Sequence, residues 1–82
     1  MPYIPKKDRE RLLAKEISRT PGELNFQITD LVNKFLYEAN AENYAGFNAV
    51  VGTLECVKLE LYRRRIAEYE NAKIKQNGDV YK

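Results

Sequence analysis

Apolar side chains recur at steps of three and four residues over residues 20–39, which predicts an amphipathic helix there. Thr20 can accept a hydrogen bond as the N-cap, and Pro21 fits the first helical position because its missing N–H has no helical partner. Glu23 follows the cap by three residues and completes a capping box. The helix is therefore expected to begin at Thr20 and to bury one face, made of Leu24, Ile28, Leu31, Val32, Phe35 and Leu36.

A second, longer helical pattern covers residues 44–75, which contain no proline. One apolar stripe comprises Phe47, Val50, Val51, Leu54, Val57 and Leu61, and a second, rotated stripe comprises Leu59, Tyr62, Ile66 and Tyr69. Gly78 follows as a left-handed C-cap. The interior glycines Gly46 and Gly52 leave two interpretations open. Either they allow a close helix–helix approach, or Gly46 marks the helix start and Gly52 is merely tolerated.

The other segments are short, and none has the alternating pattern of a strand. Two prolines make residues 1–5 an extended arm, residues 6–18 form a short charged helix, residues 40–43 are a break, and residues 77–82 form a tail. The predicted fold is all-α and spans residues 1–82 as a single domain. It consists of a short N-terminal helix and a helical hairpin with a long C-terminal helix.

The unequal helix lengths predict an oligomer. At 1.5 Å per residue the long helix would measure roughly 45 Å and its partner roughly 28 Å, so the distal half of the long helix lacks cover within its own chain. A chain of 82 residues also has a thin stability margin. Cys56 is the only cysteine and histidine is absent, so neither an intrachain disulfide nor a zinc site can stabilise it. We therefore expect a homo-oligomer.

Composition excludes several classes of function. The net charge of +2, from 14 basic and 12 acidic side chains, argues against nucleic-acid binding by bulk electrostatics. No apolar run reaches the length of a signal peptide or of a membrane span, so we expect a cytoplasmic protein that does not enter membranes. Without histidine, imidazole catalysis is impossible, and Cys56 is expected to be a buried structural thiol. We expect no enzyme activity, no metal and no cofactor.

The candidate binding residues form a row in which cations and rings alternate on the long helix: Lys58, Tyr62, Arg65, Tyr69 and Lys73, with Arg63 and Arg64 beside it. Steps of three and four residues would place one guanidinium between two rings. Such a row suits a ligand that has phosphates and a flat base, through ion pairs and stacking. The alternative interpretation is a solvated face or a subunit interface that binds no small molecule.

Four segments carry a resemblance to a known family: residues 1–5, Met-Pro-Tyr-Ile-Pro; residues 21–26, Pro-Gly-Glu-Leu-Asn-Phe; residues 54–64, from Leu54 to Arg64; and residues 77–81, Asn-Gly-Asp-Val-Tyr. The chain resembles a family of small proteins, without an established activity, from tailed phages and prophage-carrying bacterial genomes. The resemblance covers nearly the whole chain. It implies a phage-encoded protein in the host cytoplasm.

Our functional hypothesis is a non-catalytic oligomer that sequesters an anionic small molecule. By analogy with small helical phage proteins, that ligand would be a nucleotide signal of host immunity, and the protein would act as a sponge. One alternative is an adaptor or inhibitor that binds a host or phage protein through the same helix face. A small nucleic-acid-binding regulator is the third hypothesis, against which the balanced charge argues.

Overall fold

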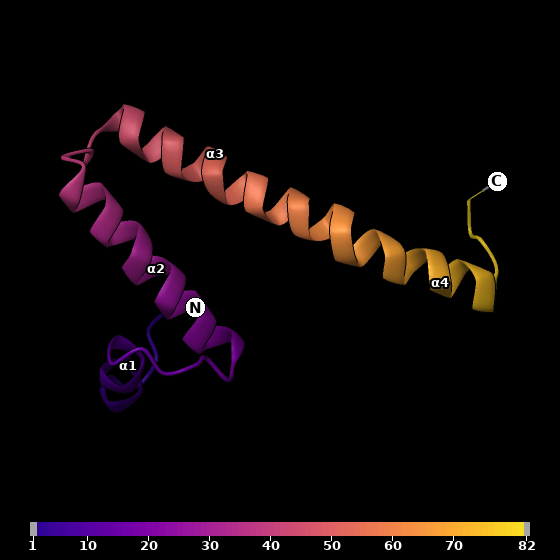
Figure 1. Ribbon diagram of the computed structural model, residues 1–82, viewed down its shortest axis with the longest axis horizontal. Coiled ribbons are helices and arrows are strands. Elements are labelled where there is room, and N and C mark those ends of the chain that lie inside the picture. Colours follow the sequence, from indigo (N-terminus) through magenta and orange to yellow (C-terminus); the bar gives the residue numbers. More distant parts are fainter. Residues whose placement is uncertain (1, 82) are drawn as a thin grey trace. The chain divides into compact units, whose positions relative to one another are not determined.

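The computed structural model describes residues 2–81, and every regular element in that range is helical (Figure 1). The elements are α1 (Lys6–Leu13), α2 (Pro21–Glu38), α3 (Tyr44–Leu61), a π-helical turn η1 (Tyr62–Ile66) and α4 (Ala67–Asn77). The all-α prediction is thus confirmed. Met1 and Lys82, the ends of the predicted arm and tail, lie outside the described residues.

The chain divides into two compact units, one up to Phe47 and one from Asn48 onward, with the boundary inside α3. The predicted hairpin depends on how these two units are placed relative to one another, so it stays a prediction. Each unit is therefore described by itself.

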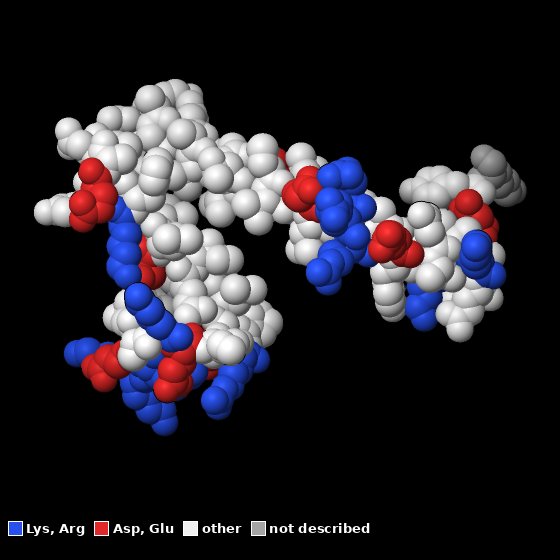
Figure 2. All heavy atoms as spheres, viewed as in Figure 1, with Lys and Arg blue, Asp and Glu red and all other residues white. Residues whose placement is uncertain are grey.

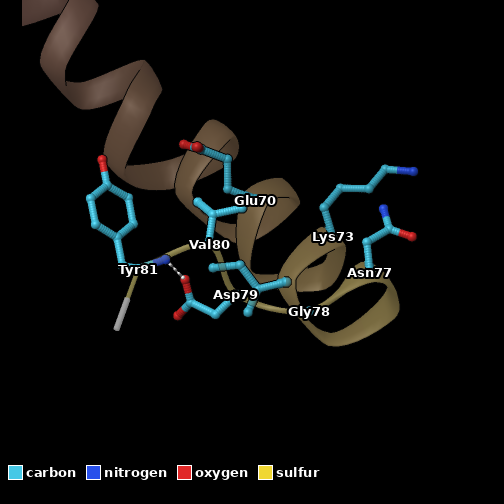
Figure 3. Close-up of a pocket in the computed structure, with 8 residues that line it drawn as sticks. Glu70, Lys73, Asn77, Gly78, Asp79, Val80 and Tyr81 are labelled. Atoms are coloured by element: carbon cyan, nitrogen blue, oxygen red, sulfur yellow. Dashed lines mark hydrogen bonds between the residues drawn. The ribbon is translucent and has the colours of Figure 1, made fainter.

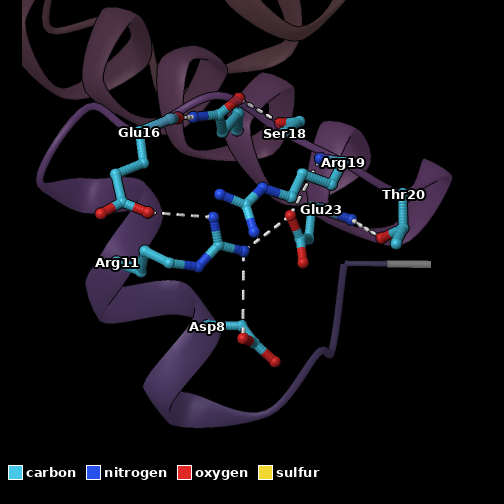
Figure 4. A network of polar contacts seen from close by, with 8 residues as sticks. Asp8, Arg11, Glu16, Ser18, Arg19, Thr20 and Glu23 are labelled. Atoms are coloured by element: carbon cyan, nitrogen blue, oxygen red, sulfur yellow. Dashed lines mark hydrogen bonds and ion pairs between the residues drawn. The ribbon is translucent and has the colours of Figure 1, made fainter.

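In the first unit, α1 packs against α2 around a small core and a polar network (Figure 4). Leu12 and Leu36 supply the buried apolar side chains. The Arg11 guanidinium lies 2.7 Å from a carboxylate oxygen of Glu23 and 3.2 Å from one of Glu16. The bond from Arg11 lowers the pKa of the Glu23 carboxyl, and the same bond raises the pKa of Arg11. This largely buried ion pair joins the two helices.

The start of α2 confirms the Thr20 half of the predicted capping box, whereas the Glu23 side chain bonds one residue before the cap. The hydroxyl oxygen of Thr20 accepts the backbone N–H of Glu23 at 3.1 Å, and Pro21 occupies the first helical position. The Glu23 carboxylate accepts the backbone N–H of Arg19 at 3.0 Å, so it caps the chain just before the helix as well. Glu23 therefore combines a capping function with the ion pair to α1.

Helix α1 ends at Leu13, short of the predicted end at residue 18, and this corrects the sequence-based range. Lys15 takes a φ of 68°, which turns the chain out of the helix. Beyond that turn, the backbone carbonyl of Glu16 accepts a hydrogen bond from the side-chain amide of Gln27 in α2, at 2.8 Å. Ser18 also donates to Gln27. These bonds to α2 replace a further helical turn, which has few apolar positions to bury.

The connection between α2 and α3 is tightly built, and it answers the question about Gly46. Asn40 takes a φ of 51°, and the N–H of Ala41 donates back to the carbonyl of Leu36 at 2.8 Å, as in a Schellman cap. Asn43 then caps α3, because its side-chain oxygen accepts the N–H of Gly46 at 2.8 Å. A Cβ at Gly46 would lie 2.7 Å from the carbonyl carbon of Ala41 and closer still to its oxygen. Gly46 is thus the third residue of α3, and its missing side chain leaves room for the connecting loop at Ala41.

The second unit is one helical segment that runs without a break from Asn48 to Asn77 and passes through η1. A Cβ added at Gly52 would meet no atom within 4 Å, so no close packing explains this glycine. The segment ends where Gly78 takes a φ of 92°, a conformation that favours glycine and that the sequence predicts. Its last residues extend slightly past the predicted end at residue 75.

Candidate functional site

The π-helical turn decides which side chains share a face in the second unit. The N–H of Ala67 donates to the carbonyl of Tyr62, five residues earlier, so η1 holds one residue more than an α-helical turn. One extra residue rotates everything after it by roughly 100° relative to an uninterrupted α-helix. Side chains before and after η1 therefore align differently from the prediction for a regular helix.

This rotation brings Ile66 and Tyr69 of the second predicted stripe into line with the first stripe. Leu61 and Ile66 are five residues apart, which in a regular α-helix would separate them by roughly 140° around the axis. Across a turn with i to i+5 bonding, the same spacing is about one turn. We call the resulting surface the apolar stripe, and it consists of Leu54, Val57, Leu61, Ile66 and Tyr69.

All five side chains of the apolar stripe are exposed, by between 38% and 65% of their surface. Isolated exposed apolar residues are common on protein surfaces, but a contiguous row over several helical turns is typical of an interaction surface. The stripe is therefore the most conspicuous feature of the second unit.

The same rotation divides the predicted row of cations and rings. Tyr69 and Lys73 remain together, with the Lys73 ammonium 5.6 Å from the centre of the ring. Before η1, Lys58 pairs with Glu55 at 2.9 Å. Tyr62 donates a hydrogen bond to Glu70, eight residues later, and the extra residue in η1 helps to bring the two to one face. Within residues 2–81 no guanidinium stacks on either ring of the predicted row.

The three consecutive arginines have different surroundings, although their basic side chains gather over one stretch of the helix (Figure 2). Arg63 pairs with Glu60 at 2.9 Å. Arg64 and Arg65 instead line a shallow hollow whose apolar part includes Val57 and Leu61. Within the described part of the chain, neither Arg64 nor Arg65 has a carboxylate partner, so both guanidinium groups are available to an anion.

The tail forms a second hollow by returning along α4 (Figure 3). Val80 and Tyr81 lie on the side of Glu70, and the N–H of Tyr81 donates to the Asp79 carboxylate at 2.8 Å. The hydrogen bond from Tyr62 to the Glu70 carboxylate raises the pKa of the Tyr62 phenol, and the nearby Tyr81 adds to this shift. Val80 and Tyr81 stay more than 80% exposed, so the tail buries neither side chain against α4.

Cys56 corrects another expectation, because its thiol is free and exposed, not buried. It lies in the second unit at the edge of the hollow that Arg64 and Arg65 line, away from any packed core. Within residues 2–81, no three side chains of the metal-binding types His, Cys, Asp and Glu gather in one place. No helix of the described chain combines the length and apolarity needed to cross a membrane.

The π-helical turn is the feature that sequence reasoning missed, although the sequence contains a signal for it. Apolar positions step by three and four residues up to Leu61, then by five to Ile66, and by three again to Tyr69. In a regular helix that five-residue step places Ile66 and Tyr69 on a second, rotated stripe, and for these two residues the interpretation is wrong. A one-residue insertion that keeps a single stripe is the interpretation that matches the structure.

Comparison with known proteins identifies the family of this chain. No curated protein and no solved structure matches it. One family model, described as a domain of unknown function (DUF6899), matches residues 1–80. Because this match covers almost the whole sequence, the chain belongs to the DUF6899 family.

Proposed function

We propose that this protein is a non-catalytic binding protein whose working surface is the apolar stripe, and that it binds a helical face of a protein. The observation that carries the proposal is the alignment of Leu54, Leu61 and Ile66 on one exposed side by η1. Realigning these side chains has no use in an isolated solvated helix. Such an alignment is useful when a partner protein contacts the helix along several turns, as in helix–helix recognition.

The proposal favours protein binding over catalysis for chemical reasons. The chain has no histidine, and three carboxylates of the second unit are already engaged. Glu55 and Glu60 pair with cations, and Glu70 accepts the hydrogen bond of the Tyr62 phenol. An apolar surface flanked by charges instead resembles the core and rim of a protein interface. In the phage setting that the resemblance implies, the partner would be a host or phage protein in the host cytoplasm, or another copy of this chain.

The test compares charges placed inside and outside the stripe. The variant Leu61→Asp/Ile66→Asp places charges in the stripe. Leu59→Asp is the matched control, because Leu59 is an equally exposed leucine that lies roughly 160° around the axis from Leu61. Tagged proteins are made in a cell that carries the native gene and are cross-linked, and the linked partners are identified by mass spectrometry. We expect the wild type and Leu59→Asp to link the same protein and the double aspartate variant to lose it. Equal linking by all three proteins would contradict the proposal.

A second candidate function rests on a separate observation, the two available guanidinium groups of Arg64 and Arg65 beside Val57 and Leu61. We propose that this hollow is the part of the predicted row best suited to an anionic small molecule, with phosphates on the arginines and a base on the apolar side chains. In a phage setting that ligand would be a nucleotide signal of host immunity, which the protein would sequester.

Thermal melting against a panel of linear and cyclic nucleotides tests this second candidate. A ligand that binds only the folded state raises the melting temperature, and the rise grows with its affinity. We expect a nucleotide to raise the melting temperature of the wild type but not of Arg64→Gln/Arg65→Gln. The variant Arg63→Gln is the matched control, because Arg63 already pairs with Glu60. No shift at millimolar nucleotide would exclude this role.

A further inference from the structure

The end of α4 places an asparagine side chain directly before a backbone nitrogen that no side chain shields. Asn77 is the last residue of the helix and is exposed, and Gly78 follows it with a φ of 92°. In Figure 3 the Asn77 amide projects from the end of α4 beside Lys73, without a hydrogen bond to any other residue drawn. Asn77 is also the only asparagine in the sequence that precedes a glycine.

We propose that the Asn77–Gly78 pair is a site of spontaneous deamidation, a covalent modification that needs only water as a second reactant. The backbone nitrogen of Gly78 attacks the side-chain carbonyl carbon, Cγ, of Asn77. A bond forms between these two atoms and the bond from Cγ to Nδ2 breaks. The side-chain nitrogen leaves as ammonia, with the proton that the Gly78 nitrogen gives up. Water then opens the cyclic imide at either of its carbonyl carbons, and position 77 becomes aspartate or isoaspartate.

The surroundings of Gly78 leave room for this attack. A Cβ added at Gly78 would meet no atom within 4 Å, so the space beside the attacking nitrogen is open. Glycine also adopts many backbone conformations, which lets the chain follow as the imide ring closes. The tail beyond it offers little resistance, because Val80 and Tyr81 are both more than 80% exposed.

One backbone hydrogen bond opposes the reaction. The N–H of Gly78 donates to the carbonyl of Ile74 at 2.8 Å, and this bond holds the nitrogen in the helical geometry, turned away from the Asn77 side chain. The attack therefore requires the last turn of α4 to open. Opening at an exposed helix end costs little free energy compared with opening in the interior. The fold thus slows the modification at Asn77 but does not prevent it.

The modification changes both the charge and the shape of the helix end. Either product adds a carboxylate, which lowers the formal net charge of +2 by one. This carboxylate lies at the C-terminus of α4, where the helix dipole disfavours negative charge. Isoaspartate also adds a methylene group to the main chain between Ile74 and Gly78, so their hydrogen bond is lost. We therefore expect the tail to leave its position along α4, which removes the tail hollow.

Incubation of the purified full-length protein in heavy-oxygen water, followed by peptide mapping with mass spectrometry, tests the proposal. Water that opens the imide leaves its oxygen in the product, so the label marks each asparagine that has reacted during the incubation. Asn71 is an internal control, because it lies inside the same helix and precedes Ala72. We expect labelled aspartate and isoaspartate at position 77, formed at least about tenfold faster than at position 71, since opening an interior turn breaks several more hydrogen bonds.

The same full-length chain unfolded in urea tests the control by the fold. Without the bond from Gly78 to Ile74, position 77 should react faster than in the folded protein. Equal rates would overturn the assignment of this bond as the brake. No label at position 77 of the folded protein, after a time that modifies the unfolded chain, would overturn the modification site itself.

The variant Asn77→Gln separates the modification from other changes during incubation. Glutamine keeps the amide, but its longer side chain would have to close a larger and less favourable ring. After incubation, the wild type should lose hydrogen-exchange protection at the Gly78 amide, and Asn77→Gln should keep it. Equal loss in both proteins would overturn the link between the modification and the helix end. These results do not depend on the function proposed for the apolar stripe.

Discussion

Gly46 and Gly52 lie six positions apart in the same helix, and the structure predicts opposite effects when each is replaced by alanine. Alanine is favoured over glycine in a helix interior by up to about 1 kcal/mol, so both changes would stabilise an isolated helix. At Gly46, however, the added Cβ would lie 2.7 Å from the carbonyl carbon of Ala41 and closer still to its oxygen. A backbone carbonyl cannot rotate away as a flexible side chain does, so the connecting loop has to shift.

The magnitude follows from the competition between these two effects. Overpacking of this kind costs about 1–3 kcal/mol, against a propensity gain of at most about 1 kcal/mol. We expect Gly46→Ala to lower the free energy of unfolding by about 1–2 kcal/mol. Gly52 has open space around it, so Gly52→Ala should raise the free energy of unfolding by up to about 1 kcal/mol.

Urea unfolding followed by circular dichroism measures the free energy of unfolding of both variants and the wild type. A shift of the urea midpoint without a change in the denaturant slope reports a change in stability. Amide hydrogen exchange at Ala41 and Gly46 locates the effect, because the Ala41 N–H donates to Leu36 and the Gly46 N–H donates to Asn43. We expect Gly46→Ala to lose protection at these amides and Gly52→Ala to keep it. A Gly46→Ala protein at least as stable as the wild type would refute the close approach of the loop.

Three further predictions concern the first unit. Thr20→Ala removes the N-cap bond of α2 and should lower the free energy of unfolding by about 1 kcal/mol, measured by urea unfolding. Leu12→Ala empties the most buried side-chain position of the small core and should cost about 2–5 kcal/mol, with retained stability contradicting the packing of α1 on α2. Glu23→Gln should be less stable than the wild type at neutral pH. Because the folded pKa of Glu23 is lowered, its contribution is complete above the unfolded-state pKa of ~4.3 and is lost as the pH falls through the folded value. The free energies of unfolding of the two proteins should therefore converge at low pH. A difference between them that stays constant from neutral to low pH would contradict the ion pair.

Much of the helical layout is predictable because it depends on local signals. The Thr20 hydroxyl and Pro21 act within one turn, and the glycine requirement at Gly78 is a property of that residue alone. The end of α1 was not predictable in the same way. It depends on Gln27 in α2 competing for the backbone at Glu16, and these two residues are eleven positions apart. The exposure of Cys56 also required knowledge of what surrounds its helix.

By itself, the sequence determined the helical class, the start of α2, the end of α4 and the clustering of charge near Arg64, because capping chemistry and apolar periodicity act over a few residues. Only the tertiary structure decided which side chains share a face across η1. The N–H of Ala67 donates to Tyr62 instead of Arg63, which rotates all later positions, and the five-residue step from Leu61 to Ile66 fits either acceptor. The tail hollow and the ion pair between Arg11 and Glu23 likewise require the folded chain, since each joins residues more than one helical turn apart.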